Sequence, residues 1–469
     1  MEKKHTMSPL TRFLFIATML IGTFTMSISQ SSLSTAYPTL MTYFGISADT
    51  IQWLTTGFMI VMCITMPISP WLLNNMSFKR LFALVLILFD LGTLIIFFGT
   101  SFPMVMLGRV MEAAAVGVLF PSYQTVLLEI TPEKKRGTIM GVAGLVMGSA
   151  LACGPIISGI VLNYTTWRGL FVFFMIIITL VLLVSFFVMK DVMARKETKL
   201  DWLSIFYTLG LVGLLYFISE IGHPNANYLN LGIILIISLI MLSLFVHRQL
   251  TIKNPLLDLW VMKSFNYDLS VLLTGFSYIS LIVVTIIFPL YYQQVLHVSP
   301  FISGMALVPG AALLSFLNPL TGTLADKFGF KSTMIFGMCM IVVGWGLLTC
   351  LHLTNIWGMI LIAMLIEGGN AFVMMPAVTL GANSLPDDLI SHGTAVITTI
   401  RQVLGSTGVT VATLILVNFT KMATNSGKSL PLANQFGFHA VYVTFFIIAV
   451  IGLVIAFMIR NTQKTKQSA

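Results

Sequence analysis

The sequence predicts an all-α membrane protein with fourteen spanning helices, on the evidence of its composition, its apolar runs and the placement of its charges. Of the 469 residues, 57% are hydrophobic and only 9% are charged, whereas soluble domains carry about 25% charged residues. So little charge cannot cover a water-soluble fold of this length, but lipid can solvate such a surface. A spanning helix needs about 20 apolar residues, so the chain has room for fourteen spans with short loops.

Fourteen apolar runs are each long enough to cross a bilayer. They lie at approximately 12–36, 50–72, 81–100, 103–128, 138–162, 167–189, 202–220, 228–247, 268–291, 302–323, 333–351, 356–382, 396–418 and 438–460. The first run is as long as a full span and lacks a small-residue cleavage site, so it is interpreted as a helix of the mature protein.

The basic residues predict the orientation of these spans. If the N-terminus is cytoplasmic, all but four of the 25 lysines and arginines fall in inside segments; the exceptions are Arg109, Arg168, Lys421 and Lys428. This bias is the positive-inside pattern of a multi-pass protein. We therefore expect an even number of spans, both termini in the cytoplasm and a location in the cell membrane, with a bacterial source. The same pattern accounts for the net charge of +9, so no nucleic-acid partner is expected.

No motif for an enzyme, a metal or a cofactor is visible. The sequence has no Walker A loop, no zinc-type cluster and no Ser/His/Asp arrangement, so we expect no enzyme activity, no cofactor and no metal, and an energy source other than ATP hydrolysis by this chain. The four cysteines lie in apolar runs without metal-ligand spacing and are interpreted as buried hydrophobic residues: Cys63, Cys153, Cys339 and Cys350.

An internal repeat divides the chain into two halves. One set of residues recurs 252 positions later: Pro67, Leu72, Phe78 and Lys79 as Pro319, Leu324, Phe330 and Lys331. Glu112 and Pro121 likewise recur, 255 positions later, as Glu367 and Pro376. Repeated halves are typical of transporters. Six helices with short loops would give a smaller offset, so we expect a six-helix bundle at 1–200, two inserted helices at 201–250 and a second six-helix bundle at 251–469.

The loop PLTGTLADKFGFK (Pro319–Lys331) joins two predicted spans. Gly322 and Gly329 permit a tight turn, and Asp326 is expected at a helix N-terminus, where negative charge is favoured. In the first-half copy, PWLLNNMSFKR, an asparagine and a serine replace the aspartate and the glycine.

This loop resembles the G-x-L-A-D-x-x-G loop of the major facilitator superfamily, and four further stretches strengthen the resemblance. They are GRVMEAAAVGVLFP (Gly108–Pro121), GLVMGSALACGPIISG (Gly144–Gly159), TTWRGLF (Thr165–Phe171) and IRQVLGSTG (Ile400–Gly408). Together they are similar to the fourteen-span drug:proton antiporter branch. The resemblance implies two bundles around a central cavity, alternating access and multidrug export driven by protons, with the kink at Gly154 and Pro155 favouring outward release.

The chain departs from this branch in the first span. An aspartate is usual about nine residues before a proline there, but Ser29 precedes Pro38 at that distance, beside Gln30. Any proton site must therefore lie elsewhere.

Four charged residues lie deep inside predicted spans, away from the span ends: Asp90, Arg109, Glu112 and Glu367. A charge at mid-membrane costs about 2.5–3.5 kcal/mol on insertion scales, so we regard them as proton-coupling candidates. From the 1.5 Å rise per helical residue, the three carboxylates lie near the midplane, where transporter sites are found.

Each candidate has a functional and a structural interpretation. Glu112 shares a helix face with Arg109 and either exchanges a proton for a cationic substrate or forms a static ion pair. Glu367 has no basic neighbour in its own span, so it either carries a proton, donates a hydrogen bond as a neutral acid or pairs with Arg109. Asp90 is either a proton site, a partner for Arg109 or a polar tie between helices.

The substrate site is expected around these carboxylates. Glu112 and Glu367 are the charged candidates, with Asn370 one turn beyond Glu367 and Gln30 in the first span. Aromatic and methionine side chains suit flat or cationic compounds, and the candidates are Phe276, Tyr278, Phe372 and Met374.

The function predicted from the sequence is therefore a monomeric proton-coupled antiporter that exports small amphipathic or cationic compounds, with protons, small molecules and membrane lipids as its partners. A lipid or metabolite exporter of the same fold is the alternative, since fold does not fix substrate. A non-transporting membrane sensor or scaffold is the second alternative.

Overall fold

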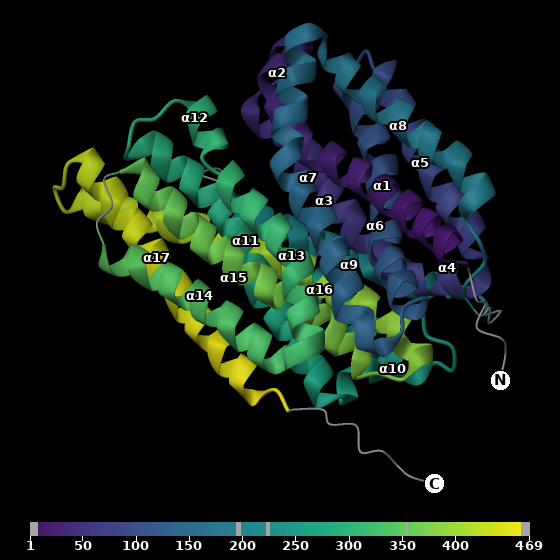
Figure 1. The fold of residues 1–469 in the computed structure, drawn as a ribbon. Coiled ribbons are helices and arrows are strands. Elements are labelled where there is room, and N and C mark those ends of the chain that lie inside the picture. The colour runs from purple at the N-terminus through teal and green to yellow at the C-terminus, as the bar shows by residue number, and fades with distance from the viewer. Residues whose placement is uncertain (1–7, 194–197, 222–225, 352–354, 461–469) are drawn as a thin grey trace. The chain divides into compact units, whose positions relative to one another are not determined.

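The computed structural model of the chain describes residues 8–193, 198–221, 226–351 and 355–460. These residues form helices and no β-strand (Figure 1). Fourteen of the described helical segments are long and apolar enough to cross a membrane, so the predicted all-α fold with fourteen spans is confirmed. The cytoplasmic placement of the termini remains a prediction, and some of the charges behind it lie outside the described residues: Lys3, Lys4, Arg195, Lys196, Lys464 and Lys466.

The helices group into two compact units, each described here by itself. The first unit takes in 1–132, 145–261 and 386–410, and the second takes in 133–144, 262–385 and 411–469. The helices wholly in the first unit are α1 (Pro9–Ser32), α2 (Tyr37–Phe44), α3 (Ala48–Thr65), α4 (Ser69–Asn75), α5 (Phe78–Phe97), α6 (Phe102–Glu129), α8 (Trp167–Val188), α9 (Trp202–Glu220) and α10 (Tyr228–Thr251).

The remaining helices belong to the second unit or contribute to both. Those wholly in the second unit are α11 (Phe265–Gln294), α12 (Pro300–Met305), α13 (Val308–Phe328), α14 (Phe330–Cys350), α15 (Ile356–Asn383) and α17 (Leu430–Met458). Helices α7 (Arg136–Tyr164) and α16 (Ile390–Asn425) contribute residues to both. Short 3-10 turns complete the described part: η1 (Leu33–Ala36), η2 (Met66–Ile68), η3 (Glu133–Lys135), η4 (Leu259–Lys263) and η5 (Asp387–Leu389).

Proline, glycine and serine determine several helix boundaries. The second span changes from α3 to α4 through η2, where Pro67 and Pro70 cannot donate backbone hydrogen bonds. The Ser77 hydroxyl accepts the Arg80 backbone N–H at 3.3 Å and caps α5. Gly329 separates α13 from α14 with φ = 95°, a conformation that residues with a side chain rarely adopt.

Each unit has its own buried contacts. In the first unit, Ile28, Ala150 and Leu170 join α1, α7 and α8 in one apolar cluster. Another cluster contains Cys63 and Leu215, so the predicted inserted helix α9 packs on α3. In the second unit, α15 is buried along most of its length.

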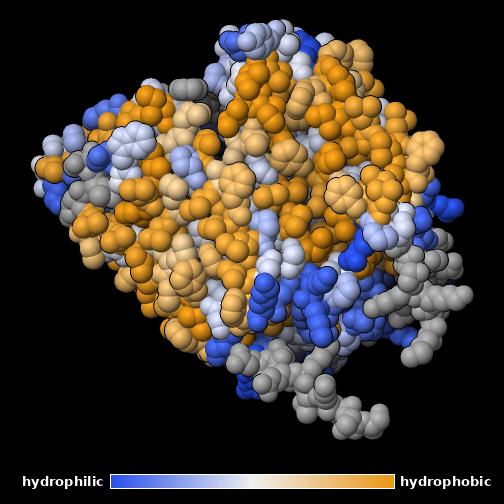
Figure 2. All heavy atoms as spheres, in the orientation of Figure 1, coloured by the Kyte–Doolittle hydropathy of each residue, from blue (hydrophilic) through white to orange (hydrophobic). Residues whose placement is uncertain are grey.

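Apolar side chains also cover most of the outer face shown in Figure 2. Phe13, Phe187 and Phe316 are among the most exposed large apolar residues. Water would not tolerate this much apolar surface, whereas lipid solvates it. The cysteines are free thiols. Cys63 is buried as predicted, but the prediction for Cys350 was wrong, because it is the last residue of α14 and is exposed.

The observed span boundaries follow the apolar runs closely, with the largest differences in the last two spans. The fourteenth span was predicted at 438–460, but α17 begins at Leu430. The thirteenth span was predicted at 396–418, but α16 begins at Ile390 and ends at Asn425. The added residues at both ends are polar or small, such as Ser391, His392 and Thr424. Hydropathy detects the apolar centre of a span, whereas a helix continues as long as backbone hydrogen bonds and packing favour it.

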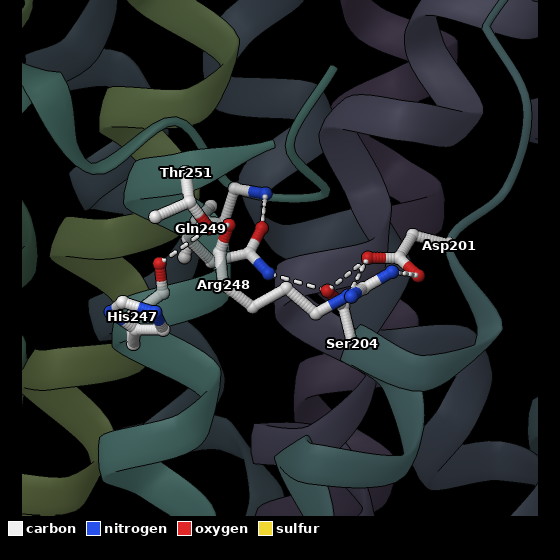
Figure 3. A network of polar contacts seen from close by, with 7 residues as sticks. Asp201, Ser204, His247, Arg248, Gln249 and Thr251 are labelled. Carbon is white, nitrogen blue, oxygen red and sulfur yellow. Dashed lines mark hydrogen bonds and ion pairs between the residues drawn. The ribbon is translucent and has the colours of Figure 1, made fainter. Parts of the chain in front are cut away.

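A polar network joins α9 to α10 at one end of this helix pair (Figure 3). Arg248 donates two hydrogen bonds to the Asp201 carboxylate, at 2.7 and 2.9 Å, and they lower the pKa of Asp201. Gln249 donates to the Ser204 hydroxyl at 2.5 Å. The side-chain oxygen of Gln249, Oε1, accepts the Leu257 backbone N–H at 3.0 Å. The network therefore also fixes the segment that follows α10.

Candidate functional site

The first unit holds a buried ion pair within α6. Arg109 Nη1 lies 2.6 Å from Glu112 Oε2, and the exposed fraction of both residues is 0%. The other carboxylate oxygen, Oε1, accepts the hydroxyl of Thr93 on α5 at 2.8 Å. The guanidinium carbon of Arg109 lies 4.2 Å from the ring centre of Phe58 on α3, a cation–π arrangement. Both oxygens of Glu112 and the charge of Arg109 therefore have partners.

Two glycines bring Thr93 to this pair. A Cβ on Gly108 would lie 2.5 Å from the carbonyl oxygen of Gly92, and one on Gly92 would lie 2.7 Å from that of Gly108. Larger residues at either position would force α5 and α6 apart. The close approach of the two backbones places the Thr93 hydroxyl within bonding distance of a carboxylate nineteen residues further along the chain.

Asp90 lies on α5, apart from the ion pair. The Thr179 hydroxyl of α8 donates to Asp90 Oδ2 at 2.8 Å. The other carboxylate oxygen is buried and has no hydrogen-bond partner among the described residues. The geometry fits a tie between α5 and α8, which was one of the interpretations of the sequence. The ion-pair partner that the structure gives to Arg109 is Glu112.

The second unit holds an isolated carboxylate, Glu367 on α15. Its exposed fraction is 3%, and within the part of the chain that the structure describes it has no hydrogen bond and no ion pair. The carboxyl group lies close to the backbone of α13 at Gly310, where an added Cβ would lie 3.1 Å from the carboxyl carbon. An ionised carboxylate without a counter-charge would be strongly disfavoured at this buried position. Glu367 therefore requires either a bound proton or a cation from outside the protein.

Further buried polar groups of the second unit lie on the helices around Glu367. Asn370, also on α15, accepts the Ser277 hydroxyl of α11 at 2.6 Å, and its amide nitrogen has no described partner. The Tyr292 hydroxyl of α11 is buried and likewise unpartnered within the described residues. These orphan groups could be satisfied by water or by a ligand.

The remaining predicted substrate residues are dispersed. Met374 is buried on α15, and Tyr278 packs against a buried cluster of α11, α13 and α15. Phe276 lies against Gly452 of α17. Phe372 stacks edge-on with the exposed Phe336 of α14, at 4.9 Å between ring centres.

Gln30 is the uncharged substrate candidate of the first unit, where it is partly buried on α1. Its neighbour Ser29 is buried, and the Ser29 hydroxyl finds no hydrogen-bond partner among the described residues. A buried, uncharged hydroxyl therefore stands at the position where the family that the sequence resembles usually has a carboxylate.

Asp326 caps the N-terminus of α7. Its Oδ1 accepts the Gly137 backbone N–H at 2.9 Å, and its Oδ2 accepts the backbone N–H and the hydroxyl of Thr138, both at 2.7 Å. Gly322 permits this contact, since a Cβ there would lie 2.2 Å from the carbonyl oxygen of Gly137. The carboxylate thus satisfies two orphan donors of a helix that is distant in sequence.

The glycines of α7 play unequal parts. A Cβ on Gly154 would lie 2.0 Å from the Ser31 hydroxyl of α1, and that hydroxyl donates to the Ala150 carbonyl at 2.9 Å. Pro155 follows on the exposed side of the same helix. Gly159 faces open space, so it does not serve close helix packing as Gly154 does.

Several partners in these sites were missing from the sequence predictions. Thr93 binds Glu112, Thr138 binds Asp326, and Ser277 binds Asn370. Each is a hydroxyl on one helix that meets a charged or amide group on another. A polar residue within an apolar run was the available signal, but the sequence cannot say which helices adjoin.

Together the spanning helices and their internal charges define a multi-pass membrane transport protein. The chain belongs to the Major Facilitator Superfamily, whose sequence pattern matches residues 19–409. It is 34% identical over 464 residues to the uncharacterized transporter YcnB of Bacillus subtilis, covering 97% of each chain. It is 35% identical to the lincomycin resistance protein LmrB of Listeria monocytogenes, covering 96% of this chain and 97% of that protein.

Solved structures agree on the fold. The human organic anion transporter MFSD10 aligns with a TM-score of 0.67 at 12% identity, covering 96% of this chain and 100% of that one. At this identity the likeness supports the fold alone. It confirms the major facilitator fold that the motifs predicted.

Proposed function

We propose that this protein exports small amphipathic or cationic compounds in exchange for protons, as a multidrug efflux antiporter. The name of the LmrB relative supports a drug as the cargo, and the family supports transport of a small molecule. The observation that carries proton coupling is the isolation of Glu367, a buried carboxylate without a described partner. Such a group can be neutral only by holding a proton or a cation.

In this proposal Glu367 carries the proton and meets the substrate. A proton from outside occupies the carboxyl in one state of the transporter, and a cationic substrate competes for it in the other. Coupling requires only that the two ligands favour different states of one site. Asn370, one turn further along α15, supplies a polar group beside it, whereas Arg109 and Glu112 neutralise each other and hold α6 in place.

The remaining parts of the proposal follow the sequence. The protein works as a monomer in the cell membrane with both termini in the cytoplasm, in contact with lipids. Two six-helix bundles at 1–200 and 251–469 alternate in access, and 201–250 forms an inserted pair. The caps at Asp326, Gly322 and Gly329 and the motif at Gly154 and Pro155 act in the conformational change.

Transport by the purified chain in proteoliposomes tests the proposal. Vesicles with an acidic interior should accumulate a quaternary ammonium dye, a fluoroquinolone, a tetracycline or lincomycin, and an ionophore that collapses the pH gradient should abolish this accumulation. Glu367→Gln should lose it, while Glu220→Gln, a matched change at the end of α9, should keep it. Undiminished gradient-driven accumulation by Glu367→Gln would refute the proposed role of Glu367.

A further inference from the structure

The side chain of Asn370 holds an amide donor that no described residue uses. Asn370 lies on α15 with an exposed fraction of 0%, and its side-chain nitrogen has no hydrogen-bond partner within the described ranges. Its side-chain oxygen is occupied, because the Ser277 hydroxyl of α11 donates to it at 2.6 Å. The amide group of an asparagine can donate two hydrogen bonds, and buried donors normally have a partner. The nitrogen of Asn370 can therefore bind an acceptor from outside the chain.

The hydroxyl of Ser277 points differently from the two buried hydroxyls before it on α11. Ser270 and Thr274 donate to carbonyl oxygens of their own helix four residues earlier, at 2.7 and 2.8 Å. Ser277 instead donates to Asn370 on the neighbouring helix. By occupying the amide oxygen, Ser277 leaves the nitrogen as the end of the amide that can still bind a ligand.

Glu367 lies one turn before Asn370 on the same face of α15. Residues three apart on a helix have their Cβ atoms about 5–6 Å from each other. Glu367 is 3% exposed, and its Oε2 has no partner among the residues that the structure describes. This face of α15 thus carries two unsatisfied groups of different kinds. The carboxyl requires a cation or a proton, and the amide nitrogen requires an acceptor.

The helices on either side hold this part of α15 in place. In the second unit α11, α13 and α15 lie side by side (Figure 1), and Leu281, Leu314 and Ala371 join them in one buried cluster. Thr321 of α13 also donates to the carbonyl oxygen of Ala371 at 2.8 Å. Packed helices therefore set the spacing between the carboxyl and the amide, as a site that selects its ligand requires.

We propose that Glu367 and Asn370 recognise the cargo together, and that the preferred cargo is an organic cation with a hydrogen-bond acceptor about 5 Å from its charge. The cation pairs with the Glu367 carboxylate, and the acceptor, such as an ester or amide carbonyl, accepts the Asn370 amide N–H. Ser277 is a positioning residue, because it acts through Asn370. Both binding groups are buried in this structure, so the cargo reaches them in a conformation that opens this face of α15.

This inference rests on the proposed role of Glu367 as a cation site. The preference for an acceptor is a separate claim, because it depends on Asn370 and needs no proton gradient. The two claims can therefore be tested in one protein by different measurements.

A matched pair of quaternary ammonium ions tests the preference. Benzoylcholine carries an ester carbonyl near its charge, and phenylbutyltrimethylammonium has the same chain length without the ester. Each ion would displace the fluorescent aromatic cation ethidium from the full chain in detergent. The readout is the ratio of the two dissociation constants, which does not depend on how much of a preparation is folded.

Loss of the amide should change this ratio. Asn370→Leu should shift it about three- to tenfold in favour of the ion without the ester. Ser277→Ala should shift it about two- to threefold in the same direction, because the amide is no longer held in one orientation. Ser277→Thr keeps the hydroxyl and should retain the wild-type ratio. The matched control Ser270→Ala removes a hydroxyl that bonds its own helix, so it should also leave the ratio unchanged.

Glu367→Gln separates this inference from the proposed antiport. It removes the charge that attracts both ions, so it should weaken both to a similar extent and leave their ratio unchanged. An unchanged ratio in Asn370→Leu, unweakened binding of both ions by Glu367→Gln, or no displacement of ethidium by either ion from the wild type would overturn joint recognition.

Gradient-driven accumulation then decides the fate of the antiport by itself. If Asn370→Leu left the ratio unchanged while Glu367→Gln abolished accumulation, the proposed antiport would stand without the preference for an acceptor. If Asn370→Leu shifted the ratio and Glu367→Gln weakened both ions but still accumulated substrate normally, joint recognition would stand and the proton role of Glu367 would fall.

Discussion

Glu112 in the first unit and Glu367 in the second occupy matching places in the internal repeat, yet their surroundings differ in kind. Glu112 has an arginine 2.6 Å away and a threonine hydroxyl at 2.8 Å. Glu367 has no described partner for either oxygen. A carboxylate with built-in counter-charge is stable as it stands, whereas an isolated one must obtain its partner from outside. The comparison therefore supports the proposed division of roles, with a structural role for Glu112 and an exchange role for Glu367.

The repeat shows how this difference arises. At an offset of 255 the place of Arg109 is taken by Met364, and at an offset of 252 the place of Thr93 is taken by Trp345. The indole of Trp345 donates to Ser280 at 2.6 Å. The positions of both groups that bind Glu112 are thus occupied by side chains that make no hydrogen bond or ion pair with Glu367. The same helical scaffold supports a paired carboxylate in one half and an unpaired buried carboxylate in the other.

The largest expected effect is on transport by the two glutamine variants. Glu367→Gln should lower gradient-driven accumulation at least about tenfold, because glutamine cannot take up a proton. Exchange of labelled for unlabelled substrate without a gradient should persist. Glu112→Gln should lower both activities together, through loss of folded protein. If Glu367→Gln lost exchange and accumulation to the same extent, Glu367 would behave like Glu112, and the proposed difference between the two glutamates would be wrong.

The next effect is on stability and concerns the ion pair. Glu112→Gln and Arg109→Met should each destabilise the protein by about 3–5 kcal/mol, since each leaves a buried charge uncompensated. The double variant should recover part of this loss. Thermal unfolding in detergent measures it, with Glu367→Gln as the comparison that should be neutral or stabilising. Additive losses in the double variant would show that the two charges do not stabilise each other.

The partly exposed ion pair Asp201–Arg248 places a carboxylate in a third environment, different from those of the buried Glu112 and Glu367. Its side chains are 13% and 33% exposed, so Asp201→Asn should cost only about 1–2 kcal/mol. Because Arg248 lowers the pKa of Asp201, the contribution is present at neutral pH and is lost as pH falls below about 4. Unfolding midpoints of the wild type and of Asp201→Asn should converge at acidic pH. A difference independent of pH would contradict the charge-based explanation.

The smallest effect concerns the hydroxyl that completes the Glu112 site. Thr93→Val keeps the shape of the side chain but removes the donor to Oε1, and it should destabilise by about 1–2 kcal/mol. Ser277→Ala, which removes the donor to Asn370, provides a similar change in the second unit. If Thr93→Val is silent, water replaces the hydroxyl, and the site around Glu112 is more open than its contacts indicate.

These expectations show where sequence alone was sufficient. Periodic apolar runs located all fourteen spans because the requirement for a bilayer-length apolar helix is local. The pairing of Arg109 with Glu112 was accessible for the same reason, since residues three apart share a helix face. The isolation of Glu367 within its own span was likewise visible.

Contacts between helices were beyond the sequence. Thr93 reaches Glu112 only because Gly92 and Gly108 let two backbones approach, and no single-helix pattern encodes that crossing. Asp326 was expected at a helix N-terminus, but its partner is the start of α7, far away in the sequence. Phe276 and Phe372 were predicted to share a site but pack against different helices for the same reason. Helical spacing shows which face of a helix a residue lies on, but not which helix that face contacts.

Proton release on substrate binding tests most directly whether Glu367 is the exchange site. Purified protein in weakly buffered detergent solution, held at neutral pH, would receive ethidium while a pH indicator records released protons. The account predicts that the wild type releases protons when ethidium binds, and that Glu112→Gln also does so when the signal is normalised to folded protein. Glu367→Gln should bind ethidium without releasing protons. Equal release by Glu367→Gln and the wild type would contradict it.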